Sequence, residues 1–195
     1  MKSLLTLVAS LLLAAGSAFA HPTGPGVSQA KIIELSAHRI DRLVTLGKID
    51  ASFLRNLEKI EVSVVQNQAP AYYKARISQT PPAQGQPMQL DIAFDDDGKP
   101  LTFQVIDGGT IGTNSDWVEK DAGSLAEYSL HYVLENTANP KIALFNDGAS
   151  VFTLSKGTLN GQVVARGQLT STLTTEKLNV YQKLDGTFIS AEVIP

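Results

Sequence analysis

The end of this chain repeats a pattern from its middle. Residues 90–106 (LDIAFDDDGKPLTFQVI) align without a gap against residues 178–194 (LNVYQKLDGTFISAEVI). In both segments an alternating apolar strand leads into an Asp-Gly turn, and a second alternating strand follows. This pattern is typical of a β-hairpin. It predicts that two related units, each ending in a hairpin, follow one another along the chain.

An amphipathic helix precedes each hairpin. Apolar residues recur at helical spacing after Ser28, which is a suitable N-cap, and Gly47 is a natural end for this helix. The second helix opens with Ser124-Leu-Ala-Glu127, a capping box, and is expected to end at Asn139-Pro140. Each helix must bury its apolar face, so we expect each to pack on the strands of its own unit.

The remaining strands are predicted from alternation and from short apolar runs. They lie at residues 60–65, 73–78, 142–145, 151–154 and 163–169. Alternation suits a sheet with one face on a helix and the other in water. In the first hairpin the side chains expected to face inward are Leu90, Ile92, Phe94, Leu101, Phe103 and Val105.

These elements predict the fold class α+β, as two tandem repeats. Each repeat would be one amphipathic helix packed on an antiparallel sheet of about four strands. The first unit spans residues 28–106 and the second spans residues 122–195, with a glycine-rich linker at residues 107–121. Residues 21–27 are expected to form a flexible N-terminal arm.

The first twenty residues have the features of a signal peptide. Lys2 supplies a positive start, an apolar run follows, and Ala18-Phe19-Ala20 is a small-x-small cleavage signal. We therefore expect cleavage after Ala20 and a periplasmic or secreted protein. No later apolar run approaches the length of a transmembrane segment.

The composition excludes several classes of partner. Of the 16 basic and 19 acidic residues, only Lys2 lies in the predicted leader, so the mature chain is weakly acidic. This scattered charge argues against nucleic acid, which favours a basic stripe, and against an anionic membrane surface. The chain has no cysteine, so neither a disulfide framework nor a cysteine nucleophile is expected.

The order of helix, antiparallel sheet and Asp-Gly hairpin resembles the PepSY-type domain of exported bacterial proteins. The residues that carry the resemblance are Leu90-Asp-Ile-Ala-Phe with Asp97-Gly98, and Leu178-Asn-Val-Tyr with Asp185-Gly186. The resemblance implies a non-enzymatic binding or regulatory module, with a peptidase or another envelope protein as its partner. It implies no catalytic residue and no cofactor.

One residue suggests a metal. After cleavage, His21 would be the N-terminal residue, and its amine and imidazole could bind one Cu(II) together with a second histidine. The other histidines, His38 and His131, lie on the predicted helices. A periplasmic copper-binding protein is therefore the alternative function, and an uninvolved residue on a flexible arm is the simpler interpretation of His21.

Other patterns have simpler structural explanations. The run Asp95-Asp96-Asp97-Gly98 lacks the remaining ligands of an EF-hand loop, and only Asp-Gly recurs in the second hairpin, so it predicts a turn. Two helix faces combine a histidine with charged neighbours at i,i+4 spacing, and both are typical of a solvated helix surface. They are the sets Glu34, His38 and Arg42, and Glu127, His131 and Glu135.

Two aromatic residues are candidates for binding a partner. Tyr72 precedes a predicted strand, and Trp117 lies in the linker. Aromatic side chains with a polar tip are favoured at protein interfaces. Ordinary packing between the two units is the alternative for Trp117. A carrier for a small apolar ligand between helix and sheet is a third possible function.

Overall fold

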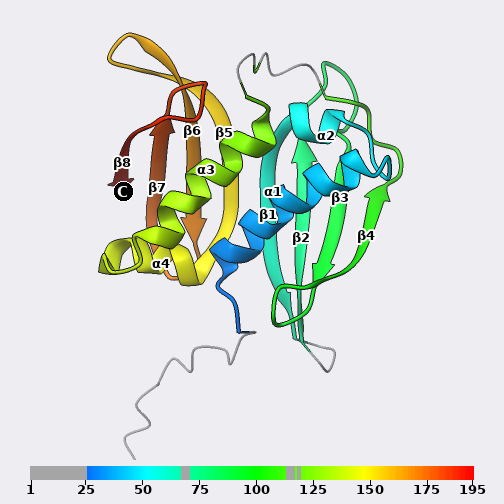
Figure 1. The fold of residues 1–195 in the computed structure, drawn as a ribbon, viewed down its shortest axis with the longest axis horizontal. Coiled ribbons are helices and arrows are strands. Elements are labelled where there is room, and N and C mark those ends of the chain that lie inside the picture. The colour runs from blue at the N-terminus through cyan, green and yellow to red at the C-terminus, as the bar shows by residue number, and fades with distance from the viewer. Residues whose placement is uncertain (1–25, 67–70, 113–116, 118–119) are drawn as a thin grey trace, which may run out of the picture.

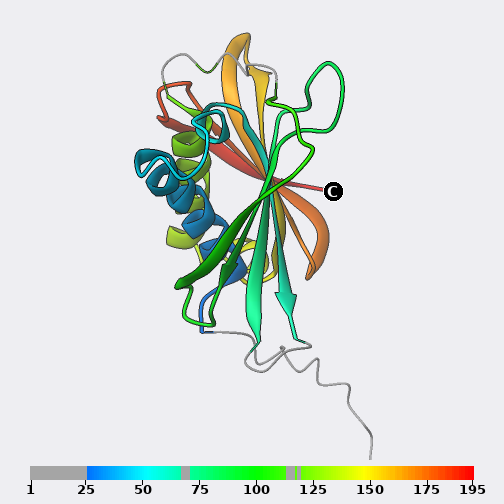
Figure 2. The same cartoon turned by 90° about the vertical axis from the view of Figure 1, so that its right-hand side faces the viewer.

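The computed structural model describes residues 26–66, 71–112, 117 and 120–195. These residues form one antiparallel sheet with helices against one of its faces (Figures 1 and 2). The helices are α1 (Gln29–Thr45), α2 (Ser52–Arg55), α3 (Ala122–Glu135) and α4 (Pro140–Gly148). The strands are β1 (Leu57–Val65), β2 (Tyr72–Gln79), β3 (Gln89–Phe94), β4 (Pro100–Ile106), β5 (Ala149–Leu159), β6 (Gln162–Ser171), β7 (Thr174–Gln182) and β8 (Phe188–Ile194).

The two central strands of the sheet are β1 and β5, each the first strand of a group of four that follow one another in sequence. The order is β4-β3-β2-β1-β5-β6-β7-β8, and neighbouring strands are antiparallel. We call α1 to β4 the first half and α3 to β8 the second half. The predicted α+β class with an antiparallel sheet is confirmed. The described strands nevertheless form one sheet of eight rather than two of four, because β1 pairs with β5.

A row of apolar side chains crosses the whole sheet and faces the helices. At its centre, Ile60 on β1 is paired with Phe152 on β5, and both are fully buried. Cross-strand pairing extends this row to both edges through Val105, Leu90, Ile77, Ile60, Phe152, Leu169, Leu178 and Val193. Helices α1 and α3 cover the row, so the halves share one hydrophobic core.

The first helix begins and ends as the sequence predicts. Ser28 is its N-cap, and the Ser28 hydroxyl accepts a hydrogen bond from the backbone N–H of Lys31. The helix ends at Thr45, and Gly47 follows with a φ of 63°, a conformation that favours glycine. The side chains of Ile33, Ala37 and Ile40 are fully buried against the sheet and α3.

The predicted limits of the second helix are partly wrong. Asp121 rather than Ser124 is the N-cap of α3, and its carboxylate accepts from the N–H of Ser124 at 2.8 Å. The strand predicted at residues 142–145 is also wrong, because this segment belongs to α4. The Asn139 side chain caps α4 through the N–H of Lys141, and Pro140 occupies its first turn. Helix α3 ends at Glu135, so Asn139-Pro140, predicted to end this helix, instead begins the next one.

Both predicted Asp-Gly hairpins are confirmed, and their turns have the same hydrogen bonds. In the first, Asp95 N–H donates to the Lys99 carbonyl and Gly98 N–H donates to the Asp95 carbonyl. In the second, Lys183 and Gly186 make the equivalent bonds. Gly98 and Gly186 have φ angles of 79° and 90°. The run of aspartates serves this turn, since Asp95 Oδ1 accepts from the N–H groups at positions 97 and 99.

The expected inward-facing set of the first hairpin is buried only on β3. Leu90, Ile92 and Phe94 are buried, whereas Leu101 and Phe103 on β4 are 54% and 38% exposed. Phe103 is paired with Ile92 and therefore faces the helix side, as expected. It stays exposed because β4 is an edge strand.

Gly98 allows a destabilisation test that separates backbone strain from crowding. A Cβ at Gly98 would lie 2.8 Å from Leu35 Cδ1, whereas one at Gly108, also at positive φ, would meet no atom within 4 Å. We expect Gly98→Ala to lower the free energy of unfolding by about 2–3 kcal/mol and Gly108→Ala by about 1 kcal/mol. Urea denaturation measures both, and equal losses would contradict the crowding against Leu35.

Candidate functional site

The sheet face opposite the helices, which we call the open face, carries polar side chains. Side chains alternate along a strand, so the residues next to the apolar row face the open side. On the first half they form the cross-strand row Glu61, Arg76, Asp91 and Gln104. No described helix covers this face, as Figure 2 shows. It is therefore a surface on which polar groups can meet a ligand.

Two hollows indent the open face of the first half and meet at Lys74. The larger, about 460 Å³, extends towards the second half, and its polar lining residues are Glu61, Ser63, Lys74, Arg76 and Ser150. The smaller, about 220 Å³, extends towards the edge strand β4, and its lining includes Tyr72, Lys74, Asp91, Thr102 and Gln104. We call the two hollows together the trough.

Three charged side chains meet in the trough. Asp91 Oδ1 accepts from Arg76 Nε at 2.8 Å, and Oδ2 accepts from Arg76 Nη2 at 2.9 Å. Lys74 Nζ lies 2.8 Å from the same Oδ2. We call Lys74, Arg76 and Asp91 the charged trio. Its carboxylate is largely buried, at 13% exposure, whereas the Lys74 and Arg76 side chains are 37% and 43% exposed.

The charges of the trio stabilise one another. The hydrogen bonds from Arg76, helped by Lys74, lower the pKa of Asp91 below its ordinary value, although burial acts in the opposite sense. The pKa of Arg76 is raised, first by its hydrogen bond to Asp91. Both shifts favour the ionised forms. The trio therefore carries one net positive charge at neutral pH, and that charge is exposed in the trough.

The lowered pKa of Asp91 predicts how stability depends on pH. A carboxylate with a lower pKa in the folded chain stabilises the fold fully above its unfolded pKa of about 3.9, and this contribution is lost as pH falls through the lowered folded pKa. We expect Asp91→Asn to flatten the fall of unfolding free energy between about pH 5 and pH 2. Urea denaturation of both proteins across this range measures it, and parallel pH profiles would contradict it.

The second half has a neutral counterpart of the Arg76–Asp91 pair. Arg76 and Asp91 lie one position from the buried pair Ile77–Leu90, and Gln168 and Asn179 lie at the same place beside Leu169–Leu178. Gln168 Nε2 donates to Asn179 Oδ1 at 2.9 Å, so an amide pair occupies the register that an ion pair occupies in the first half.

Beyond that amide pair, the hydrogen bonds continue towards the edge strand β8. Asn179 Nδ2 donates to the Tyr181 hydroxyl, which in turn donates to Glu192 Oε1 at 2.7 Å. The hydrogen bond to Glu192 raises the pKa of Tyr181. The open face thus carries a charged pair on one half and an uncharged amide pair on the other.

Of the two aromatic residues predicted to bind a partner, one lies in the trough. Tyr72, at the start of β2, is partly exposed and lines the smaller hollow. Trp117 instead packs, partly buried, against the hydrophobic core, and Lys156 Nζ lies 5.2 Å from the centre of its ring. The structure therefore does not bring Tyr72 and Trp117 into one site.

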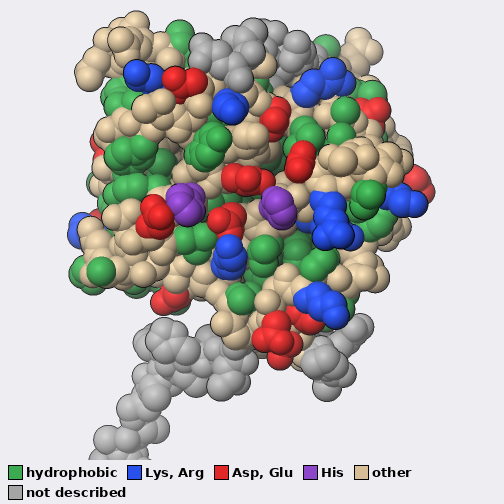
Figure 3. Space-filling view, in the orientation of Figure 1, with side chains coloured by type: hydrophobic (Ala, Val, Ile, Leu, Met, Phe, Trp, Pro, Cys, Tyr) green, Lys and Arg blue, Asp and Glu red, His purple; other side chains and the backbone are tan. Residues whose placement is uncertain are grey.

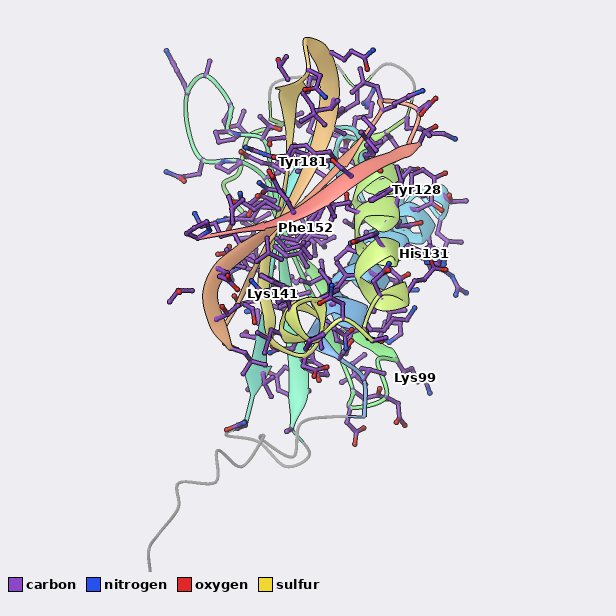
Figure 4. The ribbon with its side chains drawn as sticks, turned by 90° about the vertical axis from the view of Figure 1, so that its left-hand side faces the viewer. Lys99, Tyr128, His131, Lys141, Phe152 and Tyr181 are labelled. Carbon is purple, nitrogen blue, oxygen red and sulfur yellow. The ribbon has the colours of Figure 1, made fainter. Side chains whose placement is uncertain are left out.

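The histidines lie apart from the trough. His21 falls outside the described residues. His38 on α1 and His131 on α3 are both exposed. His131 projects from α3 in Figure 4, and Figure 3 shows histidine side chains among acidic and basic ones on the helix-covered side of the molecule. His38 Nδ1 lies 3.7 Å from Glu127 Oε1, and His131 Nε2 lies 2.9 Å from Glu135 Oε1. In the described part of the chain, His, Asp and Glu form no group of three or more placed to hold a metal.

Sequence reasoning missed the charged trio. The sequence shows Lys74, Arg76 and Asp91 only as polar residues alternating with apolar ones. Opposite charges on the polar sides of neighbouring predicted strands are a signal for such a cross-strand pair. Predicting the pair from this signal requires the register of β2 against β3, because a shift of one residue moves every side chain of a strand to the other face of the sheet.

One protein family matches this chain. A model of the DUF6488 family, which is described as a family of unknown function, matches residues 1–104, more than half of the chain. The chain belongs to this family. The DUF6488 match includes all the trough residues named above except Ser150. No curated protein and no solved structure matches the chain.

No helix in the described part of this DUF6488 chain combines the length and the apolar character that crossing a bilayer requires.

Proposed function

We propose that this DUF6488 chain is an exported, non-enzymatic protein that binds another protein through the open face of its sheet. The observation that carries the proposal is the trough, a hollowed surface with charged side chains that no described helix covers. A small-molecule site usually encloses most of its ligand. The trough is shallow and open, and its exposed charge and its aromatic residue, Tyr72, are better suited to a polypeptide partner.

The partner would be an envelope or extracellular protein. This part of the proposal depends on the predicted leader at residues 1–20, with cleavage after Ala20 and a periplasmic or secreted mature chain. The resemblance to PepSY-type domains, also a proposal, favours a peptidase whose activity the chain would modulate.

We further propose that the two halves are tandem repeats of one helix-and-sheet unit. Three observations support this: the hairpin turns have matching hydrogen bonds, the buried pairs Ile77–Leu90 and Leu169–Leu178 have matching places, and Ile60 pairs with its counterpart Phe152. A pairing of equivalent residues across an antiparallel junction is the arrangement of a two-fold symmetric interface. The halves would then resemble two subunits fused into one chain.

Affinity capture tests the binding proposal. The mature chain, residues 21–195, would carry an N-terminal tag and be incubated with an envelope extract of its own source, followed by mass spectrometry. Two variants make the test specific to a face: Ser63→Tyr adds bulk at an exposed position in the trough, and His38→Tyr adds similar bulk on the exposed helix face.

The proposal predicts a stoichiometric partner that is retained by His38→Tyr and lost with Ser63→Tyr. Circular dichroism and thermal unfolding would establish that both variants are folded. A partner that binds Ser63→Tyr normally, or that depends on His38, would contradict binding through the open face. Hydrolytic or redox turnover by the purified chain would contradict the non-enzymatic part.

A further inference from the structure

The strand pairing of the fold does not require the charged trio. At the equivalent place in the second half, the amide pair Gln168–Asn179 joins the same two strand positions at 2.9 Å. The flanking buried pairs are apolar in both halves. Since an uncharged pair joins the equivalent strand positions there, the ions at Arg76 and Asp91 point to a role beyond holding β2 to β3.

The contacts of Arg76 prepare it to bind an anion. Asp91 accepts from Nε and Nη2, which fixes the plane of the guanidinium group. A guanidinium has five N–H donors in a rigid fork, and Asp91 occupies only one edge of it. Among the described residues, Asp91 is the hydrogen-bond partner of the Arg76 side chain, which is 43% exposed. Its other edge is therefore oriented and accessible to a ligand.

The charge of the trio matches one carboxylate. Lys74 and Arg76 exceed Asp91 by a single positive charge. Glu61 also lines the larger hollow beside Arg76, and its charge is balanced by Lys59, whose Nζ lies 3.0 Å from Glu61 Oε2. One carboxylate would neutralise this excess, whereas a doubly charged phosphate would exceed it beside Asp91. The hollows extend on both sides of Lys74, so a polypeptide segment can continue past the site in both directions.

We infer that the trough binds an extended polypeptide segment by an acidic side chain, with Arg76 and Lys74 as carboxylate ligands and Asp91 as the residue that positions Arg76. The inference rests on the proposed function and specifies the chemistry of the partner. Ser63, Thr102 and Gln104 line the same trough, and their hydroxyl and amide groups are suited to hydrogen-bonding the backbone of that segment. The carboxylate of an Asp or Glu side chain fits better than a C-terminal carboxylate, because the trough continues beyond Lys74.

The probe is a short peptide in which Glu and Thr alternate, so that its Glu side chains share one face. Both termini are blocked, and binding is measured by calorimetric titration at low salt. A blocked peptide with Gln in place of Glu removes the carboxylates. The same Gln peptide with a free C-terminus tests a terminal carboxylate as the ligand.

The decisive variant is the double substitution Arg76→Gln with Asp91→Asn. It installs the pair that the protein itself uses at Gln168 and Asn179, and it leaves the formal net charge unchanged. We expect it to fold and to bind the Glu peptide at least about tenfold more weakly than wild type. Lys177→Gln, which removes a positive charge on β7, is the matched control and should leave the affinity unchanged within about twofold. Lys74→Gln is a second trough variant that also weakens binding if the double variant does not fold.

Each outcome has one meaning. Binding of the Glu peptide that is lost in the Gln peptide and in the trough variants supports the inference. Absence of Glu-peptide binding, equal binding by the double variant, or preference for the free C-terminus overturns it. If the captured partner is nevertheless lost with Ser63→Tyr, the proposed function stands and only the carboxylate chemistry fails. If capture is unaffected by Ser63→Tyr, the proposed function itself fails.

Discussion

Replacing Gly167 with valine is expected to destabilise the protein by about 3 kcal/mol or more, because this glycine lets α3 lie close to β6. A Cβ at position 167 would be 2.4 Å from Ser129 Oγ, 2.7 Å from Ser129 Cβ and 2.9 Å from Phe152 Cε2. Ser129 has little freedom to move. It lies on α3, is fully buried, and its Oγ donates to the Leu125 carbonyl and accepts from Gln182 Nε2.

A glycine on the neighbouring strand provides the control. A Cβ at Gly157 on β5 would meet only Val164 Cγ2, at 3.9 Å, which is an ordinary contact. Valine is favoured in strands, so Gly157→Val should be neutral or slightly stabilising. Thermal and urea unfolding measure both variants. Similar effects of the two substitutions would contradict the close approach of α3 to the sheet at Gly167.

Truncating Phe152 to alanine is expected to lower the free energy of unfolding by about 3–5 kcal/mol, since this residue lies at the centre of the apolar row. Its side chain is fully buried and paired with Ile60 across the β1–β5 junction. Because both halves share the core, the variant should unfold in one transition at lower urea. Two separate transitions in the wild-type protein would contradict a shared core.

An exposed phenylalanine makes the matched comparison. Phe188 on β8 is 50% exposed, and its ring stacks on Tyr132 with the centroids 4.9 Å apart. Loss of this stacking at a half-exposed edge should cost about 1 kcal/mol. If Phe188→Ala lowers the free energy of unfolding as much as Phe152→Ala does, the central place of Phe152 in the apolar row is not the reason for its large effect.

The local features of this fold could be predicted from sequence, because the residues that determine them are near one another. The turns at Gly98 and Gly186 depend on an Asp-Gly pair between alternating strands. The first helix depends on an N-cap serine, a periodic apolar face and a terminal glycine. In each case a few consecutive residues contain both the geometry and the hydrogen-bonding groups that stabilise it.

The junction of the two halves could not be predicted in this way. Nothing in residues 60–65 specifies that β5, some ninety positions later, is the neighbour of β1 rather than the edge of a separate sheet. The same limit applies to α4, because Asn139-Pro140 is compatible with the end of one helix and with the start of the next. Tertiary packing decides both.

The candidate site shows the same division. The partial exposure of Tyr72 follows from its place before a strand, and the residue does line the trough. The glycines around Trp117 place it in a linker, and nothing in this local sequence predicts that its side chain packs against the core. The charged trio depends on the register of β2 against β3, which brings Arg76 opposite Asp91 from fifteen positions away.

Photo-crosslinking tests binding through the open face most directly. A photoreactive amino acid would replace Ser63, in the trough, or His38, on the outer face of α1, and each protein would be irradiated in the envelope extract of its source. We expect one crosslinked polypeptide from position 63 and none from position 38. Crosslinking from position 38 alone would contradict it and would move the binding surface to the helices.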